Sequence, residues 1–131
     1  MRILVVDDNI DAAEILAQAA RLIDGTEVDM AESGEDAIGR AILNEYDLIS
    51  LDIRMPGVSG LDALSVIRGL RPHCILAIVS AYIRDIDPEA LKTADVVLTK
   101  PVSLERFQNV LKLTQEMGER RKAIRKMSDL D

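Results

Sequence analysis

The sequence is poor in the residues that form disulfides, bind zinc or fill a core with aromatic rings. Among its 131 residues there are one cysteine, one histidine and no tryptophan, and aromatic residues make up 2%. The single Cys74 excludes an intrachain disulfide and favours a reducing compartment, so we expect a cytoplasmic protein. Cys74 and its neighbour His73 are too small a donor set for a zinc site. Because aromatic residues are so few, the core must be built from aliphatic side chains.

Long apolar runs and the signatures of several protein classes are also absent. No run approaches the roughly 20 apolar residues that cross a bilayer, so we expect no membrane partner. The opening MRILVVDD becomes acidic too early for a secretory signal peptide. We find no helix-turn-helix pattern, no nucleotide-binding loop of the GxxxxGKS type and no other enzyme motif. These absences argue against an enzyme and against a DNA-binding output domain in this chain.

Charge is unevenly distributed along the chain. Residues 1–116 hold 11 basic and 20 acidic side chains, a net charge of −9, whereas residues 117–131 hold 5 basic and 3 acidic side chains, a net charge of +2. The acidic body disfavours nucleic acid as a partner, because duplex binding depends on cationic contacts to phosphates. We predict one domain over residues 1–117 and a basic helical tail or linker over residues 118–131.

Short apolar runs alternate five times with longer segments of helical period. Three runs are nearly continuous and predict strands buried on both faces, whereas the second run alternates like an edge strand. The predicted strands are Arg2–Val6, Thr26–Met30, Leu48–Leu51, Cys74–Val79 and Asp95–Leu98. Right-handed crossovers between strand–helix units predict an α/β fold, a doubly wound, five-stranded parallel sheet with helices on both faces.

Helix starts are marked by residues that cap helix N-termini. Ser33 and Ser59 each precede an aspartate by three residues, as in a capping box, and Ser103 follows a proline. Asp87 before Pro88 fits an N-cap with proline at the first helical position. These signals place a helix after each of the last four predicted strands.

Polar residues gather where the predicted strands end. The first strand runs into Asp7 and Asp8, the third into Asp52, the fourth into Ser80 and the fifth into Lys100. In an open parallel sheet the carboxyl ends of the strands share one edge, and ligands bind there. The sequence therefore predicts three carboxylates, one hydroxyl and one ammonium group at a single site.

This set of groups indicates a particular chemistry. Neighbouring carboxylates repel one another unless a cation neutralises them, and a carboxylate-rich site suits Mg²⁺, which we expect as the cofactor. A carboxylate can also attack phosphorus and form an aspartyl phosphate. Taken singly, the acidic pair could cap the first helix and Lys100 could be a solvated surface residue. Taken together, the groups favour phosphoryl transfer.

In their order and spacing, these motifs resemble the receiver domain of bacterial response regulators, the switches of two-component signal transduction. The resemblance covers residues 2 to about 116 and rests on ILVVDD, LDIRMPGVSGLD, VSA after the fourth strand and TKP after the fifth. It implies a flavodoxin-like (βα)5 fold, a sheet order of 2-1-3-4-5 and a cis bond before Pro101.

The resemblance also implies roles for the acidic residues. Asp52 would accept a phosphoryl group from a phosphohistidine on a histidine kinase or a phosphotransfer protein. Asp8, Asp52 and the backbone carbonyl of Arg54 would ligate Mg²⁺, and Asp7 would act through water.

The remaining implied roles concern the switch. Lys100 would pair with Asp52 at rest and with a phosphoryl oxygen afterwards, and Ser80 would move inward to hydrogen-bond the phosphoryl group. Such a chain is a switch with self-catalysed phosphotransfer and slow autodephosphorylation rather than an enzyme. It would act on a downstream protein or on a C-terminal output domain, and it could form a homodimer.

Two features depart from the family pattern or vary within it. The position three residues before the lysine, often aromatic, is Val97, and Phe107 lies beyond the lysine, so we expect no ring movement at that position. Arg54 and Tyr82 flank the site, where they would obstruct an attacking water and slow the loss of the phosphoryl group.

Other functions compete with this interpretation. A receiver that serves as a scaffold or dimerisation module without phosphorylation would need none of the site groups. An enzyme with an aspartyl-phosphate intermediate is opposed by the lack of a second acid within two residues of Asp52.

The tail also has two interpretations. Apolar residues recur there at a/d-like spacing, interrupted by Arg120. They are Val110, Leu113, Met117, Ile124 and Met127. Two heptads are few for a coiled coil, and Gly118 weakens a continuous helix by roughly 1 kcal/mol. A frayed tail or linker and a dimerising or domain-linking helix both remain open.

Overall fold

The computed structural model describes residues 1–55, 57–81 and 83–130, and within these ranges five parallel strands form one sheet. The strands are β1 Arg2–Val6, β2 Glu27–Ala31, β3 Leu48–Asp52, β4 Ile75–Ser80 and β5 Val96–Thr99. They are ordered β2-β1-β3-β4-β5, and every neighbouring pair is parallel. The predicted fold class, sheet order and edge position of the second strand are confirmed.

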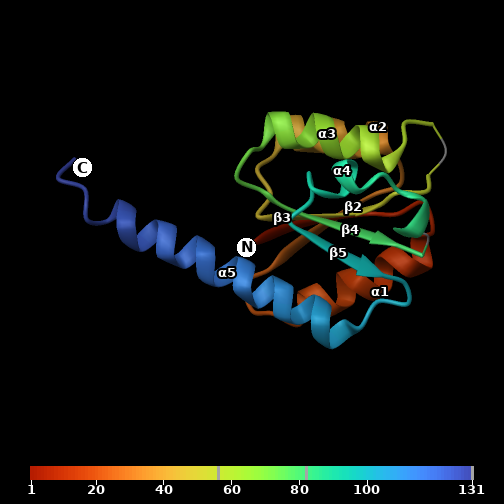
Figure 1. Ribbon diagram of the computed structural model, residues 1–131. Coiled ribbons are helices and arrows are strands. Elements are labelled where there is room, and N and C mark those ends of the chain that lie inside the picture. Colours follow the sequence, from red (N-terminus) through yellow and green to blue (C-terminus); the bar gives the residue numbers. More distant parts are fainter. Residues whose placement is uncertain (56, 82, 131) are drawn as a thin grey trace.

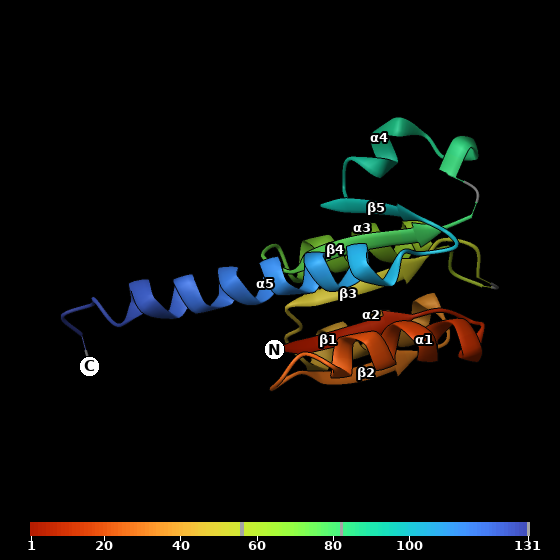
Figure 2. The same cartoon turned by 90° about the horizontal axis from the view of Figure 1, so that it is seen from below.

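Helices cover both faces of the sheet (Figure 1). They are α1 Ile10–Arg21, α2 Gly34–Leu43, α3 Gly60–Leu70, α4 Pro88–Leu91 and α5 Leu104–Arg125, with a 3₁₀ turn, η1, at Ile83–Asp85. In Figure 1, α1 and α5 lie on one face of the sheet and α2 and α3 on the other. Figure 2 shows α4 beside the β5 edge.

Four of the five strands lie about one residue further along the chain than predicted, at one or both ends. The predicted first residues of β4 and β5, Cys74 and Asp95, lie just before these strands and make other hydrogen bonds. Asp95 accepts a hydrogen bond from the backbone N–H of Leu76 through its side chain (2.8 Å), and Cys74 closes a turn onto the carbonyl of Arg71 (3.2 Å). Apolar periodicity cannot detect either contact, because it reports burial and not hydrogen bonding.

The predicted helix caps are present. The hydroxyl groups of Ser33, Ser59 and Ser103 each accept a hydrogen bond from the backbone N–H three residues later, at 3.1, 3.1 and 3.2 Å. Asp87 caps α4 through the N–H of the second residue after it. At α1 the cap is Asn9, whose side chain accepts from a backbone N–H (3.1 Å), so the acidic pair before it is not the helix cap.

The core is aliphatic, as the composition requires, and it has two halves separated by the sheet. Alternate residues of β1 and β3 face opposite sides, so that Leu4 and Ile49 pack with α2 and α3 while Ile3 and Leu48 pack with α1 and α5. Phe107 of α5 is fully buried in the second half. These layers hold the strand ends, and thereby the site, in fixed register.

The last helix extends past the sheet that it covers (Figures 1 and 2). α5 continues through Gly118 to Arg125, so this glycine does not interrupt it. Figures 1 and 2 show its second half extending away from the sheet. The boundary between residues 117 and 118 stays a prediction. Among the described helices, none combines the length and the apolar character needed to cross a membrane.

Candidate functional site

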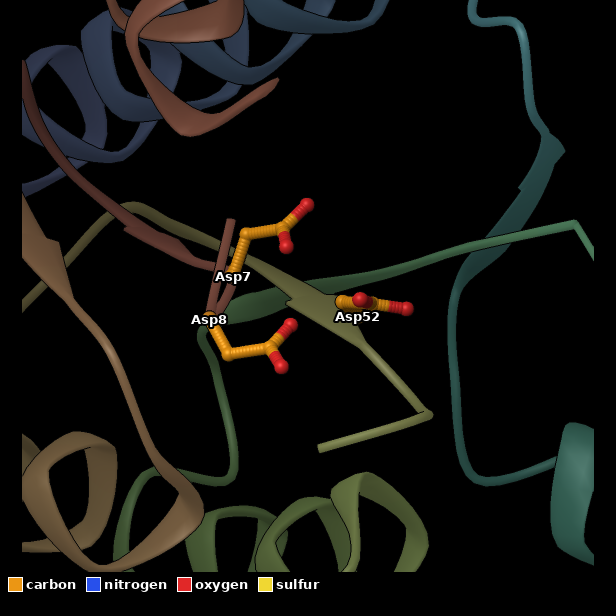
Figure 3. Close-up of side chains that lie close together, drawn as sticks. All are labelled: Asp7, Asp8 and Asp52. Atoms are coloured by element: carbon orange, nitrogen blue, oxygen red, sulfur yellow. The ribbon is translucent and has the colours of Figure 1, made fainter. Parts of the chain in front are cut away.

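Three aspartates converge at the carboxyl edge of the sheet. A carboxylate oxygen from each of Asp7, Asp8 and Asp52 lies within 4.8 Å of the other two. Figure 3 shows the three carboxyl groups near one another, two from the chain after β1 and one from the end of β3. Asp7 and Asp52 are only 3% and 7% exposed, whereas Asp8 is exposed to solvent. The three residues predicted from strand ends are therefore brought together.

Strand pairing places these groups. β1 and β3 are neighbours with Val6 opposite Leu51, so that the next residues, Asp7 and Asp52, leave adjacent strand ends. The backbone N–H of Asp7 donates to the carbonyl of Ala31 (3.1 Å), and the Asp7 carboxylate accepts from the N–H of Asn9 (2.9 Å). These bonds hold the Asp7 side chain over the sheet edge.

Lys100 brings a cation to the same edge from the end of β5. Its Nζ lies 2.9 Å from Oδ2 of Asp7 and 3.4 Å from Oδ2 of Asp52. The ammonium group thus bridges two carboxylates and is closer to Asp7, where the resemblance led us to expect Asp52 as its partner. The peptide bond between Lys100 and Pro101 is cis, as the resemblance implied.

The electrostatics of the site follow from burial and crowding. Burial and the nearby charge of Asp7 raise the pKa of Asp52, and the Lys100 ammonium group only partly offsets them. Burial lowers the pKa of Lys100, but the hydrogen bond to Asp7 and the charge of Asp52 outweigh this and raise it overall. The buried carboxyl groups are therefore undercompensated by a single ammonium group, and a further cation is favoured there.

The loop after Asp52 is packed tightly against the site. A Cβ on Gly60, the first residue of α3, would collide with the backbone oxygen of Asp52. The backbone N–H of Val58 donates to the carboxylate of Glu35 at the start of α2 (3.0 Å). That hydrogen bond lowers the pKa of Glu35. Our sequence reasoning missed Glu35 and Gly60; the glycines of GVSG were the available signal for a close backbone approach.

The other predicted site residues take different positions. Ser80 is buried at the end of β4, opposite Thr99 of β5 and one strand away from Asp52. Arg54 is exposed, and its backbone N–H lies 3.4 Å from Oδ1 of Asp52. Tyr82 lies outside the described residues.

Two residues, Val97 and Phe107, bear on the aromatic switch that is common in the family. Val97 of β5 packs partly buried against the core half formed with α2 and α3. Phe107 is fully buried in the opposite half. Neither position offers an exposed ring, because one residue is aliphatic and the other lies inside the core.

The donor set fits Mg²⁺. Three carboxylates supply hard oxygen ligands, and the exposure of Asp8 leaves the cluster open to water and to a ligand. Mg²⁺ characteristically keeps several waters and takes one or two carboxylates.

Comparison with known proteins agrees with this arrangement. The family model described as the response regulator receiver domain matches residues 3–112. A response regulator receiver protein of Anaeromyxobacter sp. is 35% identical over 108 residues, which are 81% of this chain and 45% of that protein. A cyclic di-GMP phosphodiesterase of Thermotoga maritima is 32% identical over 92% of this chain and 32% of its own length.

A solved structure of a response regulator is also similar to this chain. The response regulator TrrA of Thermotoga maritima, crystallised in complex with Mg²⁺ and BeF, is 33% identical and superposes with a TM-score of 0.78. The alignment covers 86% of this chain and 97% of that one.

Fold and site together define a class, parallel α/β domains with an acidic, ligand-accessible cluster at the carboxyl edge of the sheet. Within that class, the chain belongs to the receiver domain family of the response regulators of two-component systems. Receiver domains are in general signalling switches rather than enzymes. The chain spans about half or less of the length of the curated relatives that it matches.

Proposed function

We propose that the chain is a phosphorylation-controlled switch in which Asp52 accepts a phosphoryl group from a phosphohistidine on a histidine kinase or phosphotransfer protein. The observation that carries the proposal is the cluster of three carboxylates within 4.8 Å, two of which are bridged by Lys100. A structural salt bridge would need one carboxylate for one lysine. An exposed third carboxylate beside a buried pair is instead suited to a divalent cation and a phosphoryl group.

In the transfer step, an oxygen of Asp52 attacks the phosphorus atom. A P–O bond to Asp52 forms while the P–N bond of the donor breaks, and the bonding electron pair stays on the donor imidazole. Asp8, Asp52 and the backbone carbonyl of Arg54 would hold Mg²⁺, with Asp7 acting through water. When bound, Mg²⁺ would supply positive charge next to the carboxylates and the phosphoryl oxygens.

Lys100 and Ser80 would serve the phosphorylated state. Lys100 already lies 3.4 Å from Asp52 and would exchange its carboxylate partner for a phosphoryl oxygen. Ser80, on the neighbouring strand, would donate a hydrogen bond from its hydroxyl group to a phosphoryl oxygen. Such a change at the carboxyl edge would alter the surface that a downstream protein or a C-terminal output domain contacts.

The experiment that tests this proposal is labelling by acetyl phosphate, read by intact mass. We expect one phosphoryl adduct on the wild-type chain in Mg²⁺, and none in EDTA or on Asp52→Asn. Binding of beryllofluoride in Mg²⁺, read as a rise in thermal stability, provides a second readout that needs no donor chemistry. The absence of both adduct and binding would leave the phosphorylation-independent scaffold as the better interpretation, and an adduct on Asp52→Asn would contradict the assignment of the acceptor.

A further inference from the structure

The second half of α5 contributes no buried residue to the domain, and its first residue, Gln115, donates a side-chain hydrogen bond to the carbonyl of Asp24 (3.5 Å). The helix has 22 residues, which span about 33 Å at the usual rise. Its buried residues, Phe107, Leu111 and Thr114, all lie in its first half. Every described residue from position 119 onward is exposed, and Figure 2 shows this part projecting past the sheet. A short helix with few tertiary contacts is marginal in water, so this segment is suited to a partner.

A line of apolar side chains follows the projecting part. Leu113, Met117, Ile124 and Met127, here called the apolar stripe, are between 42% and 82% exposed. Their spacings of 4, 7 and 3 residues are those of alternating d and a positions of a heptad, and Arg120 takes the one remaining position. Met117 also lines a hollow between α5 and the residues around Glu45 and His73, but all four side chains of the stripe remain at least 42% exposed.

The charged residues beside the stripe favour a parallel orientation of a partner helix. With Met117 at a, Glu116 occupies a g position and Arg121 an e position, and both are exposed. In a parallel two-stranded coiled coil, g of one helix faces e of the next heptad on its partner, five residues further on. Glu116 and Arg121 are five residues apart, and within the described part of the chain neither has an ion-pair partner.

We propose that the apolar stripe is the seam of a parallel coiled coil formed with a second copy of this chain. Symmetry then yields two Glu116–Arg121 pairs across the interface. An antiparallel arrangement would set g against g and e against e and would lose both pairs. An anionic lipid surface is a poorer occupant, because Glu116 and Glu119 lie near the stripe. The association needs no phosphoryl group and therefore goes beyond the proposed function.

Arg120 is a charged residue at the seam of the proposed coiled coil. A single polar residue at the seam lowers the stability of a coiled coil while limiting the registers it can adopt. The dimer should therefore be weak and should become tighter when this residue is made apolar.

Sedimentation velocity on the 131-residue chain tests the proposal. We expect concentration-dependent dimers below about 1 mM, a dissociation constant at least roughly tenfold larger for Ile124→Asp, and one about tenfold smaller for Arg120→Leu. Ile15→Asp on α1, which also replaces an exposed apolar residue, is the matched control and should associate like the wild type. Asp52→Asn should do the same, which separates this test from the phosphorylation test.

Charge reversal tests the register. Glu116→Arg and Arg121→Glu should each weaken the dimer, and the double variant should restore it, because the opposite-charge pairs return with their signs exchanged. Circular dichroism confirms that each variant remains folded. A chain that stays monomeric throughout, a dimer insensitive to Ile124→Asp, or a double variant without recovery would each overturn the proposal.

Discussion

Lys100 provides the most direct test of how the site is held together without a metal ion. Its Nζ bridges Asp7 and Asp52 at 2.9 and 3.4 Å, and both carboxylates are almost fully buried. Lys100→Met keeps most of the aliphatic stem and removes the charge. The two carboxylates are then left facing one another beside Asp8, without a cation.

The expected magnitude follows from those distances. At an effective dielectric constant near 20, charges 2.9–3.4 Å apart attract by roughly 5 kcal/mol per pair, and desolvation opposes much of this. Removing one partner of a buried ion pair lowers stability by about 3–5 kcal/mol. The Lys100 side chain is 28% exposed, and a carboxyl group can take up a proton. We therefore expect the free energy of unfolding to fall by about 2–3 kcal/mol at pH 7 without Mg²⁺.

The loss should depend on pH in one direction. The pKa of Asp52 already lies above its ordinary value of 3.8, and the loss of Lys100 raises it further, since Lys100 is among the groups that lower it. A carboxyl group with a raised folded-state pKa contributes its full stability below the unfolded pKa and loses it as the pH rises through the folded pKa. The deficit of the variant is therefore largest at neutral pH and shrinks toward pH 4–5, roughly.

Urea unfolding at pH 7 and pH 5, in EDTA and in Mg²⁺, measures these effects. Mg²⁺ should recover part of the loss, because it neutralises the same carboxylates. Lys92→Met, which removes a solvent-exposed ion pair with Glu89, should change stability by less than about 1 kcal/mol under every condition. A loss at Lys100 that is equal at both pH values and insensitive to Mg²⁺ would refute its role as a counter-charge.

Two further predictions concern the core around the site. Gly60→Ala should lower the free energy of unfolding by more than about 3 kcal/mol in urea titrations, because the new Cβ would meet the backbone of Asp52, whereas Gly39→Ala, with open space around it, should be neutral or stabilising by about 0.5–1 kcal/mol. Similar effects at the two glycines would contradict the close approach. Burial raises the pKa of Cys74 to about 12, so a thiol reagent at neutral pH should modify it far more slowly in the native chain than in urea. Equal rates would show that Cys74 is accessible in the folded protein.

Much of the fold could be predicted from local pattern. Apolar runs located all five strands to within about a residue, because a strand buried on both faces is apolar along its length. Serine followed by aspartate located two helix starts, because capping is a contact over three residues. The missed boundaries at β4 and β5 depend on bonds such as that of Asp95 to the backbone of Leu76, which joins positions 19 residues apart.

The site was predicted in composition but not in detail. Asp7, Asp8, Asp52 and Lys100 could be found because parallel strands place their carboxyl ends at one edge. Which carboxylate the ammonium group prefers depends on side-chain directions at β1 and β5, and these are set by packing. Glu35 was missed for the same reason, since its contact with Val58 joins the first turn of α2 to the loop after β3, and no local pattern connects the two.

Local sequence is enough to predict the class of fold, the aliphatic core, the residues available for chemistry and the heptad spacing of the tail. These are properties of local order along the chain, and a period or a neighbouring residue is enough to show them. Two features could be seen only in the folded chain: Lys100 bridges two carboxylates, and α5 extends past the sheet with its apolar stripe exposed. Both depend on where remote segments end in space, and only the packed sheet and its covering helices determine that.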